Sequence, residues 1–276
     1  MARDTWDPDQ YERFRAERSR PFYDLLERVQ PKKGMRAVDL GCGTGELTRD
    51  LHRKLGCAET IGIDSSDAML GKAKTFAEPG LHFEKGDLAT FAPEKPFDLV
   101  FSNAAIHWVS DQAALLTRLR DAVAPGGQLA IQMPANFDHP SHVLAAEVAR
   151  EPEFAAALGG YVRPADTVLA PEAYAQLLHD LGFEEQRVTL EVYGHVLGSR
   201  DEVVEWVKGT LLTDYEKRLE PALFERYLGR YREVLLPRLS PAKPFFYPFK
   251  RILFDARRSS HMGAAPPNPA LEFSPR

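Results

Sequence analysis

The stretch "VDLGCGTGELT", residues 38–48, places three glycines, Gly41, Gly43 and Gly45, directly after a short apolar run. A glycine-rich turn between a strand and a helix lets the backbone approach a bound nucleotide closely. The dinucleotide fingerprint needs glycine at its first, third and sixth positions, and the sixth position here is Glu46. That carboxylate would repel a pyrophosphate, and the loop also lacks the Gly-Lys-Ser/Thr end of a P-loop. We therefore expect a ligand without paired phosphates.

Carboxylates follow the next two predicted strands. Asp64 ends the strand "ETIGID", in the position where a carboxylate accepts both ribose hydroxyls. Asp87 ends "FEKGD", placed to accept from an adenine amino group while Leu88 packs nearby. Either carboxylate alone is as readily interpreted as a solvated turn residue, but together with the glycine loop they indicate a nucleoside site. A nucleoside that lacks phosphates and carries a cationic sulfonium suits this loop, which predicts S-adenosylmethionine as the ligand.

The elements that must position these residues alternate between strand and helix as far as residue 133. This alternation predicts a parallel sheet with helices on both faces. Seven strands are expected, at residues 35–40, 59–66, 81–88, 97–109, 127–133, 185–197 and 246–258. The fold class is therefore α/β: a seven-stranded, mostly parallel, doubly wound (Rossmann-like) sheet with its last strand antiparallel, plus a helical cap subdomain.

Four segments are expected along the chain. Residues 1–30 form N-terminal lid helices, with a break near Pro21, and residues 31–135 form the S-adenosylmethionine-binding α/β core. Residues 136–258 hold a helical substrate-specificity region interleaved with the last two strands. Residues 259–276 are rich in proline and lack periodicity, which predicts a disordered tail.

Composition excludes several classes of protein. The chain has 276 residues and a formal net charge of -5, whereas nucleic-acid-binding proteins normally carry a basic surface. Two cysteines, Cys42 and Cys57, exclude a disulfide framework, and no Cys/His spacing predicts a metal site. The charged start is not a secretory signal, and no stretch approaches the about 20 apolar residues of a membrane span. We expect a cytoplasmic monomer or homodimer that binds neither nucleic acid nor membrane.

The segments "VDLGCGTG", "GIDSSDAM", "GDLATF" and "FSNAAIHWV" resemble the successive motifs of class I S-adenosylmethionine-dependent methyltransferases. More narrowly, "WDPDQYERFRAERSRP", "QMPANFDHPSHVL" and "EWVKGT" are similar to segments of the trans-aconitate methyltransferase family. The resemblance covers all but the tail and implies release of S-adenosyl-L-homocysteine as product. It implies a cofactor site at Asp39, Gly41, Gly43, Gly45, Asp64, Ser65, Met69, Asp87, Leu88, Asn103 and Ala104.

The N-terminal segment is the expected lid over the cofactor. Trp6, Tyr11 and Phe14 fall close to one helical face, and Arg20 follows them. By similarity, Tyr11 binds near the sulfonium and Arg20 reaches a carboxylate of cofactor or substrate, while Trp6 and Phe14 contact the substrate. The competing interpretation is that aromatic residues at helical spacing serve packing alone.

Family membership implies methyl transfer to the carboxylate of a small or medium carboxylic acid. Such a group is ionised at neutral pH, so positioning and removal of water, rather than a general base, would drive the reaction. His107 and Trp108 end the fourth predicted strand at the cofactor crevice and are the expected catalytic residues. Further substrate contacts are expected at His142, Trp206, Lys208 and Tyr247.

The acceptor stays open at the level of sequence. Thr213 stands where an arginine would clamp an extra substrate carboxylate, which argues against a tricarboxylate unless Lys208 or Arg163 substitutes. A trans-aconitate-like acid and a more apolar monocarboxylate therefore both remain as acceptors. The alternatives are methylation of a phenol, amine or carbon nucleophile and, from a different class, a non-catalytic S-adenosylmethionine-binding module.

Overall fold

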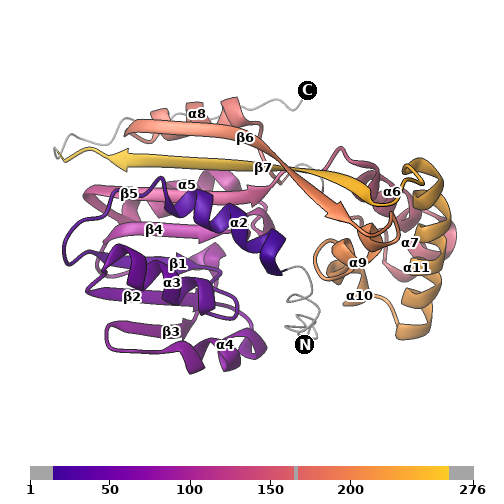
Figure 1. The fold of residues 1–276 in the computed structure, drawn as a ribbon, viewed down its shortest axis with the longest axis horizontal. Helices are drawn as coiled ribbons and strands as arrows, with labels where there is room; N and C mark the ends of the chain where they lie inside the picture. Colours follow the sequence, from indigo (N-terminus) through magenta and orange to yellow (C-terminus); the bar gives the residue numbers. More distant parts are fainter. Residues whose placement is uncertain (1–14, 165–166, 261–276) are drawn as a thin grey trace.

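The computed structural model describes residues 15–164 and 167–260. Seven strands form one sheet in the order β3-β2-β1-β4-β5-β7-β6 (Figure 1). The strands are β1 (Arg36–Leu40), β2 (Glu59–Asp64), β3 (Leu81–Lys85), β4 (Phe97–Asn103), β5 (Val123–Pro134), β6 (Phe183–Leu197) and β7 (Phe245–Arg258). β1 to β5 pair in parallel, and β7 pairs antiparallel with both β5 and β6. The predicted mostly parallel sheet with an antiparallel last strand is confirmed.

Helices cover both faces of the sheet. α2 (Arg15–Leu26) and α3 (Glu46–Leu55) pack on one face, and α5 (Gln112–Ala122) and α8 (Pro171–Asp180) pack on the other. α4 (Asp67–Ala73) packs beside β3. Because the central strands are covered on both sides, β1 and β4 are buried at nearly every position and consist mainly of apolar residues.

The break expected near Pro21 is wrong, because α2 continues through this residue. A proline inside a helix removes one backbone hydrogen bond and crowds the preceding turn. Here the residues after it, Phe22, Leu25 and Leu26, are buried against the sheet, and the Phe22 ring lies 5.1 Å from that of Phe101. Tertiary packing therefore keeps the helix intact.

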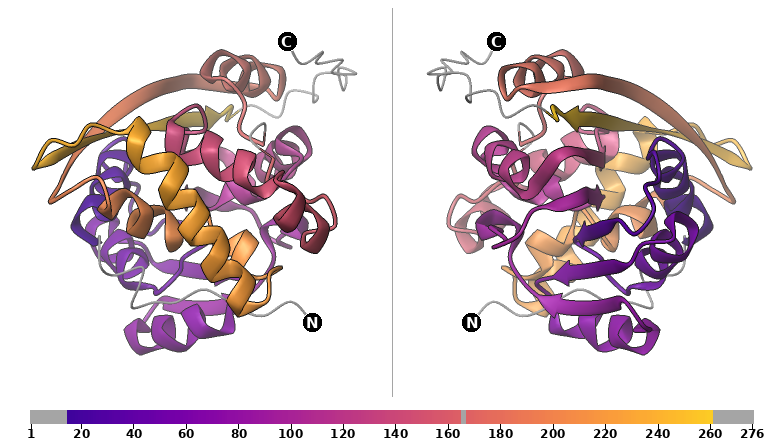
Figure 2. Two further views of the ribbon diagram at one scale, coloured as in Figure 1. Left: turned by 90° about the vertical axis from the view of Figure 1, so that its right-hand side faces the viewer. Right: turned by 90° about the vertical axis from the view of Figure 1, so that its left-hand side faces the viewer.

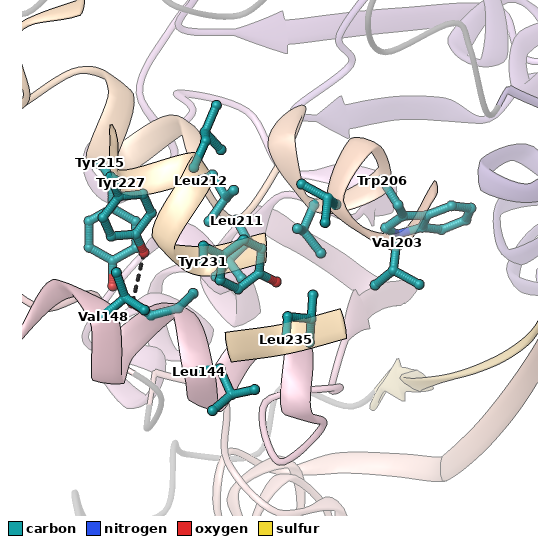
Figure 3. Packing of buried hydrophobic residues seen from close by; sticks show 14 of the residues in the cluster. Leu144, Val148, Val203, Trp206, Leu211, Leu212, Tyr215, Tyr227, Tyr231 and Leu235 are labelled. Carbon is teal, nitrogen blue, oxygen red and sulfur yellow. Dashed lines mark hydrogen bonds between the residues drawn. The ribbon is translucent and has the colours of Figure 1, made fainter. Parts of the chain in front are cut away.

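Further helices form a separate group at the carboxyl ends of the parallel strands (Figures 1 and 2). This helical group comprises α6 (Pro140–Ala149), α7 (Pro152–Ala157), α9 (Glu202–Lys208), α10 (Thr213–Glu216) and α11 (Pro221–Leu235). Its members share an apolar core of their own, drawn in Figure 3. Within it the Tyr227 hydroxyl donates to the Ala145 carbonyl at 2.7 Å, and the Tyr231 hydroxyl donates to the Ser141 carbonyl at 2.7 Å.

The segment 200–219 contains the two short helices α9 and α10. Gly209 follows the last residue of α9, and glycine inside a helix is unfavourable. Both pieces still bury apolar residues in the helical group, which keeps them in place without a continuous backbone ladder. No helix in the described part of the chain is both long and apolar enough to cross a membrane.

β6 and β7 are the longest strands, with 15 and 14 residues. They pair from Phe183 opposite Arg258 to Leu197 opposite Phe245. In Figure 1 both strands run past the ends of the parallel strands and into the helical group. The sheet and the helical group are therefore joined by a continuous two-stranded ribbon.

Candidate active site

The glycine loop joins β1 to α3 through three backbone positions that favour glycine. Gly41, Gly43 and Gly45 have φ angles of 79°, 56° and 80°. A Cβ atom on Gly41 would overlap that of Ala105, and one on Gly45 would lie 2.8 Å from the Phe83 ring. The loop packs this tightly because these three positions carry no side chain, and Gly41 and Gly43 line a cleft.

This cleft, here called the cofactor cleft, has a volume of about 490 Å³ and lies at the carboxyl ends of the strands. Residues after β1 and β4 border it, and the strand order reverses between these two neighbours. Open α/β sheets bind their ligands at such a switch point. The lining residues are Gly41, Gly43, Asp64, Ser65, Met69, Asp87, Leu88, Ala89, Asn103, Ala104, Ala105, Trp108, Val109, Ser110, Asp214 and Lys217.

The two predicted nucleoside-binding carboxylates are held by backbone groups. One Asp64 oxygen accepts from the Gly43 N–H at 2.9 Å, and the other accepts from the Ser66 N–H at 2.9 Å. The Asp87 carboxylate accepts from the Ala89 N–H at 2.8 Å. Each carboxyl oxygen has more than one lone pair, so both groups retain acceptor capacity for hydroxyl or amino donors in the cleft. These two hydrogen-bond acceptors and the glycine positions of the loop fit S-adenosylmethionine.

Asp39, expected as a cofactor residue, lies beneath the loop and does not line the cleft. It accepts from the Thr48 hydroxyl at 2.6 Å, a bond that ties β1 to α3 across the glycine loop. Burial raises the pKa of Asp39 to about 7, with the charge of Asp64 acting in the same direction and the Thr48 bond opposing it. Its contact with the cleft is therefore through the loop that it supports.

A second cavity, the inner pocket, begins where the cofactor cleft ends. β4 stops at Asn103, and the 3-10 turn η3 (Ile106–Trp108) follows, so His107 and Trp108 come after the strand and not within it as expected. The inner pocket has a volume of about 80 Å³, and Ala104 and Trp108 line both cavities. Its lining residues are Ala104, His107, Trp108, Pro134, Phe137, His142, Arg163, Trp206, Val207, Thr210, Leu211, Phe249 and Arg251.

Two guanidinium groups, from Arg163 and Arg251, line the inner pocket, and no acidic side chain of the described residues does. The Arg163 guanidinium lies 4.0 Å from the centroid of the Trp108 ring and 4.0 Å from an Asp214 oxygen. Arg251 is buried and lies 4.8 Å from the centroid of Phe249. Burial lowers the pKa of Arg163 even though Asp214 raises it, so one carboxylate does not offset the loss of water around this cation. The pocket is electrostatically suited to an anion.

Two histidines complete the polar surface of the inner pocket. His107 is 7% exposed, and its Nδ1 has no hydrogen-bond partner among the described residues. Burial, reinforced by Arg163 and Arg251, lowers the pKa of His107 well below its usual value. Burial and Arg163 lower the pKa of His142 to about 3. Both rings are therefore neutral at pH 7, and each offers one N–H donor.

Most of the residues expected in the site line one of the two cavities. The cofactor cleft takes the expected residues Gly41, Gly43, Asp64, Ser65, Met69, Asp87, Leu88, Asn103 and Ala104. The inner pocket takes the expected residues His107, Trp108, His142 and Trp206. Within the described chain, no group of three or more His, Cys, Asp or Glu side chains forms a potential metal site.

Other expected residues lie elsewhere. Gly45 belongs to the loop but is not a lining residue, and Lys208 lines neither cavity. Tyr247 is buried, with its hydroxyl 3.1 Å from the Ser141 Oγ. The Arg20 side chain is 73% exposed and lies 3.8 Å from Asp24, its ion-pair partner. Trp6, Tyr11 and Phe14 are outside the described residues.

Sequence reasoning did not assign Arg251 to the site. Strand alternation places Tyr247, Phe249 and Arg251 on one face of β7, but it does not say how far each lies from the cofactor cleft. The pairing of Arg251 with Pro134 fixes that depth, because Pro134 is the last residue of β5. Asp214 was also missed, since its place in the cofactor cleft depends on how the helical group packs.

Comparison with known proteins agrees with this geometry. A family model described as a methyltransferase domain matches residues 11–187. A trans-aconitate 2-methyltransferase of Deinococcus radiodurans is 43% identical over 259 residues, covering 92% of this chain and 98% of its own. The YcgJ protein of Bacillus subtilis shares the fold, with a TM-score of 0.58 at 15% identity, over 88% of this chain and 99% of its own.

A phosphoethanolamine N-methyltransferase 2 of Haemonchus contortus, solved with S-adenosyl-L-methionine, also shares the fold, with a TM-score of 0.51 at 19% identity. The match covers 87% of this chain and 52% of that one. The family match, the sequence identity and the cofactor cleft together establish an enzyme that uses S-adenosylmethionine. The chain belongs to the trans-aconitate 2-methyltransferase family of S-adenosylmethionine-dependent methyltransferases.

Proposed function

We propose that the enzyme methylates a carboxylate of a small acid that carries at least two carboxylates, of the trans-aconitate type. The observation that carries this proposal is the pair of guanidinium groups, Arg163 and Arg251, in a pocket that no described acidic side chain lines. The names of the similar proteins support the same acceptor class. Two guanidinium groups, with no described carboxylate among the residues that line the pocket, favour a ligand that carries more than one carboxylate.

The absence of an arginine at position 213 no longer argues against such an acid. The Thr213 side chain is buried and donates to the Thr210 carbonyl at 2.6 Å, so it does not line the inner pocket. Arg163 reaches the pocket from the loop after α7 and supplies a cation there. In our proposal Arg163 and Arg251 bind the carboxylates that do not react.

In this proposal, three groups of the cofactor cleft each contact a different part of S-adenosylmethionine. The glycine loop, through Gly41 and Gly43, makes room for the amino acid portion of S-adenosylmethionine. Asp64 accepts from the ribose hydroxyls, and Asp87 accepts from the adenine amino group. When bound, S-adenosylmethionine supplies an electrophilic methyl group, and its sulfur leaves as the thioether of S-adenosylhomocysteine.

The residues of the inner pocket position the nucleophile. An acceptor carboxylate is ionised above about pH 4, so the chain needs no base to activate it. His107 donates an N–H to that carboxylate, and Trp108 lies between the two cavities, where it excludes water from the reacting oxygen. Because its pKa is far below neutral, His107 is a poor proton acceptor, which disfavours a phenol or amine acceptor.

Residues 136–258 would then set the choice of acid. Every residue of the inner-pocket lining except Ala104, His107, Trp108 and Pro134 comes from this segment. The cofactor cleft, by contrast, takes only Asp214 and Lys217 from it among the described residues. This division supports the separation between a cofactor-binding core and a substrate-specificity region.

A panel of acids tests the proposal. Release of S-adenosylhomocysteine would be followed with trans-aconitate, fumarate, octanoate and benzoate, and each product would then be treated with mild alkali. We expect the highest kcat/KM with the tricarboxylate or the dicarboxylate, and a product that alkali hydrolyses, as a methyl ester requires. Preference for octanoate or benzoate, or a product that survives alkali, would contradict the proposal.

A further inference from the structure

A third cavity lies against the inner pocket on the side away from the cofactor cleft. This outer cavity has a volume of about 190 Å³. It shares Phe137, His142, Arg163 and Leu211 with the inner pocket, and it shares no described lining residue with the cofactor cleft. Its other lining residues are Val143, Ala146, Glu147, Arg150, Pro164 and Tyr215. The three cavities therefore form a series, with the inner pocket in the middle.

The outer cavity reaches the surface along α6. Val143 and Glu147 lie on the exposed side of this helix, Arg150 follows its last residue and is also exposed, and Val143 is 40% exposed. Phe137 and His142, which separate the outer cavity from the inner pocket, are both partly exposed, with their rings 5.8 Å apart. Because these two rings line both cavities, a change of their rotamers would alter the opening between the cavities without moving a helix.

The two ends of the series carry opposite charge. Among the described residues, the cofactor cleft is lined by Asp64, Asp87 and Asp214 against a single lysine, Lys217. The charged residues of the described chain that line the outer cavity are Arg150 and Arg163 against a single carboxylate, Glu147. S-adenosylmethionine, with a sulfonium, an ammonium and one carboxylate, is a net cation, whereas a polycarboxylic acid is an anion. Fields of this kind raise the rate at which a charged ligand of opposite sign enters a cleft.

The volumes of the cavities also favour entry of the acid from the outer cavity. The inner pocket, at about 80 Å³, is smaller than the cavity of about 150 Å³ that takes one benzene molecule. A six-carbon acid therefore needs more space than the inner pocket, and the adjacent space on the acceptor side is the outer cavity.

We propose that the acceptor acid reaches the inner pocket through the outer cavity along α6, while S-adenosylmethionine uses the cofactor cleft. This inference rests on the proposed function, because it assumes an anionic acceptor. The acid and the cofactor then do not compete for one opening, and the acid binds with the cofactor cleft already filled.

Two substitutions test the route, each with a matched control. Ala146→Phe fills the outer cavity, and Ala156→Phe places the same ring on the exposed face of α7 as its control. Arg150→Glu reverses a charge at the opening, and Lys33→Glu makes the same change on an exposed residue just before β1, at the opposite edge of the sheet. None of the four positions lines the cofactor cleft or the inner pocket.

The readout is the association rate of trans-aconitate with protein saturated with S-adenosylhomocysteine, followed by stopped-flow tryptophan fluorescence. Trp108 and Trp206 line the inner pocket and report its occupation. We expect Ala146→Phe to slow association on the order of 10-fold, within the range of steering and access effects. Arg150→Glu should slow it at low salt and lose that effect in about 1 M salt, where charges are screened beyond about 3 Å. Both controls should match the unmodified protein.

Three outcomes are distinguishable. Unchanged association in Ala146→Phe, with melting temperature and S-adenosylhomocysteine affinity also unchanged, would overturn the route and leave the proposed function standing. Equal slowing of S-adenosylmethionine binding would also overturn it, because the two ligands would then share an opening. Failure of trans-aconitate to bind the unmodified protein, checked by equilibrium dialysis, would remove the proposed function and the route together.

Discussion

Replacement of Arg163 by methionine tests whether its guanidinium binds an acceptor carboxylate. Methionine keeps an unbranched side chain of similar reach and removes the charge. A hydrogen bond to a charged group contributes about 1.5–3 kcal/mol, and about 1.4 kcal/mol corresponds to a tenfold change in rate. The kcat/KM for trans-aconitate should therefore fall roughly 10- to 100-fold. Arg163→Lys keeps the charge but loses the planar arrangement of N–H donors. Its kcat/KM should lie between that of the unmodified protein and that of Arg163→Met.

Arg163→Met should also lower stability moderately. The ion pair with Asp214 spans 4.0 Å, and the Asp214 side chain is 21% exposed, so water still reaches this carboxylate after the change. The Arg163 side chain is itself 10% exposed and donates to the Leu211 carbonyl at 3.2 Å, so we expect a loss of about 1–3 kcal/mol. A loss of activity that only follows the fraction of unfolded protein would indicate a packing role through the Trp108 ring instead.

The assay compares two acids in the same variant. Initial rates of S-adenosylhomocysteine release would be measured with trans-aconitate and with octanoate, and S-adenosylmethionine affinity would be measured by titration calorimetry. A carboxylate-binding Arg163 makes the loss large for the tricarboxylate and small for the monocarboxylate, with cofactor affinity little changed. Equal losses with both acids would refute the reasoning, because a guanidinium that binds the extra carboxylates cannot affect an acid that lacks them.

Three further outcomes follow from the geometry. His107→Ala should lower kcat/KM for the acid and leave S-adenosylmethionine affinity unchanged. Trp108→Ala should lower both quantities, since Trp108 lines both cavities. Equal cofactor affinity in the two variants would contradict this assignment. Gly41→Ala would place a Cβ atom against that of Ala105, at a position where φ is 79°. The free energy of unfolding, measured by urea titration, should fall by about 2–5 kcal/mol. A loss below about 1 kcal/mol would show that the loop relaxes. Burial raises the pKa of Asp39 from 3.8 to about 7, so the unfolded chain loses this proton at a lower pH than the folded chain does. The free energy of unfolding should therefore fall as the pH rises from about 4 to about 7. Asp39→Asn should reduce that slope, and an unchanged slope would place the ionisation elsewhere.

The sheet and the cofactor cleft could be predicted from sequence because their signals are local. The glycine loop needs left-handed backbone at Gly41, Gly43 and Gly45, and this requirement shows directly in the residue types. Asp64 and Asp87 follow strands whose carboxyl ends meet at one edge of a parallel sheet, so alternation of strand and helix is enough to bring them together.

The inner pocket could not be predicted in the same way because distant segments form it. Arg163 lies in a loop after α7, and Arg251 lies on β7, so their meeting depends on the packing of the helical group and on strand register. Tyr247 shares a face of β7 with Arg251 but lies four residues, or two periods of the alternation, farther into the helical group, where its hydroxyl lies 3.1 Å from the Ser141 Oγ. Sequence periodicity gives the face of a strand and not the distance along it.

The ribbon of β6 and β7 has a consequence for how the enzyme moves. Because both strands pass from the sheet into the helical group, any movement between these two parts has to bend or twist a ladder that pairs Phe183 through Leu197 with β7. The ribbon therefore opposes a large hinge movement, and it helps to set the separation between methyl donor and acceptor. Since about 1 Å of misplacement can cost about 100-fold in rate, a substitution far out on this ribbon can change turnover without touching either ligand.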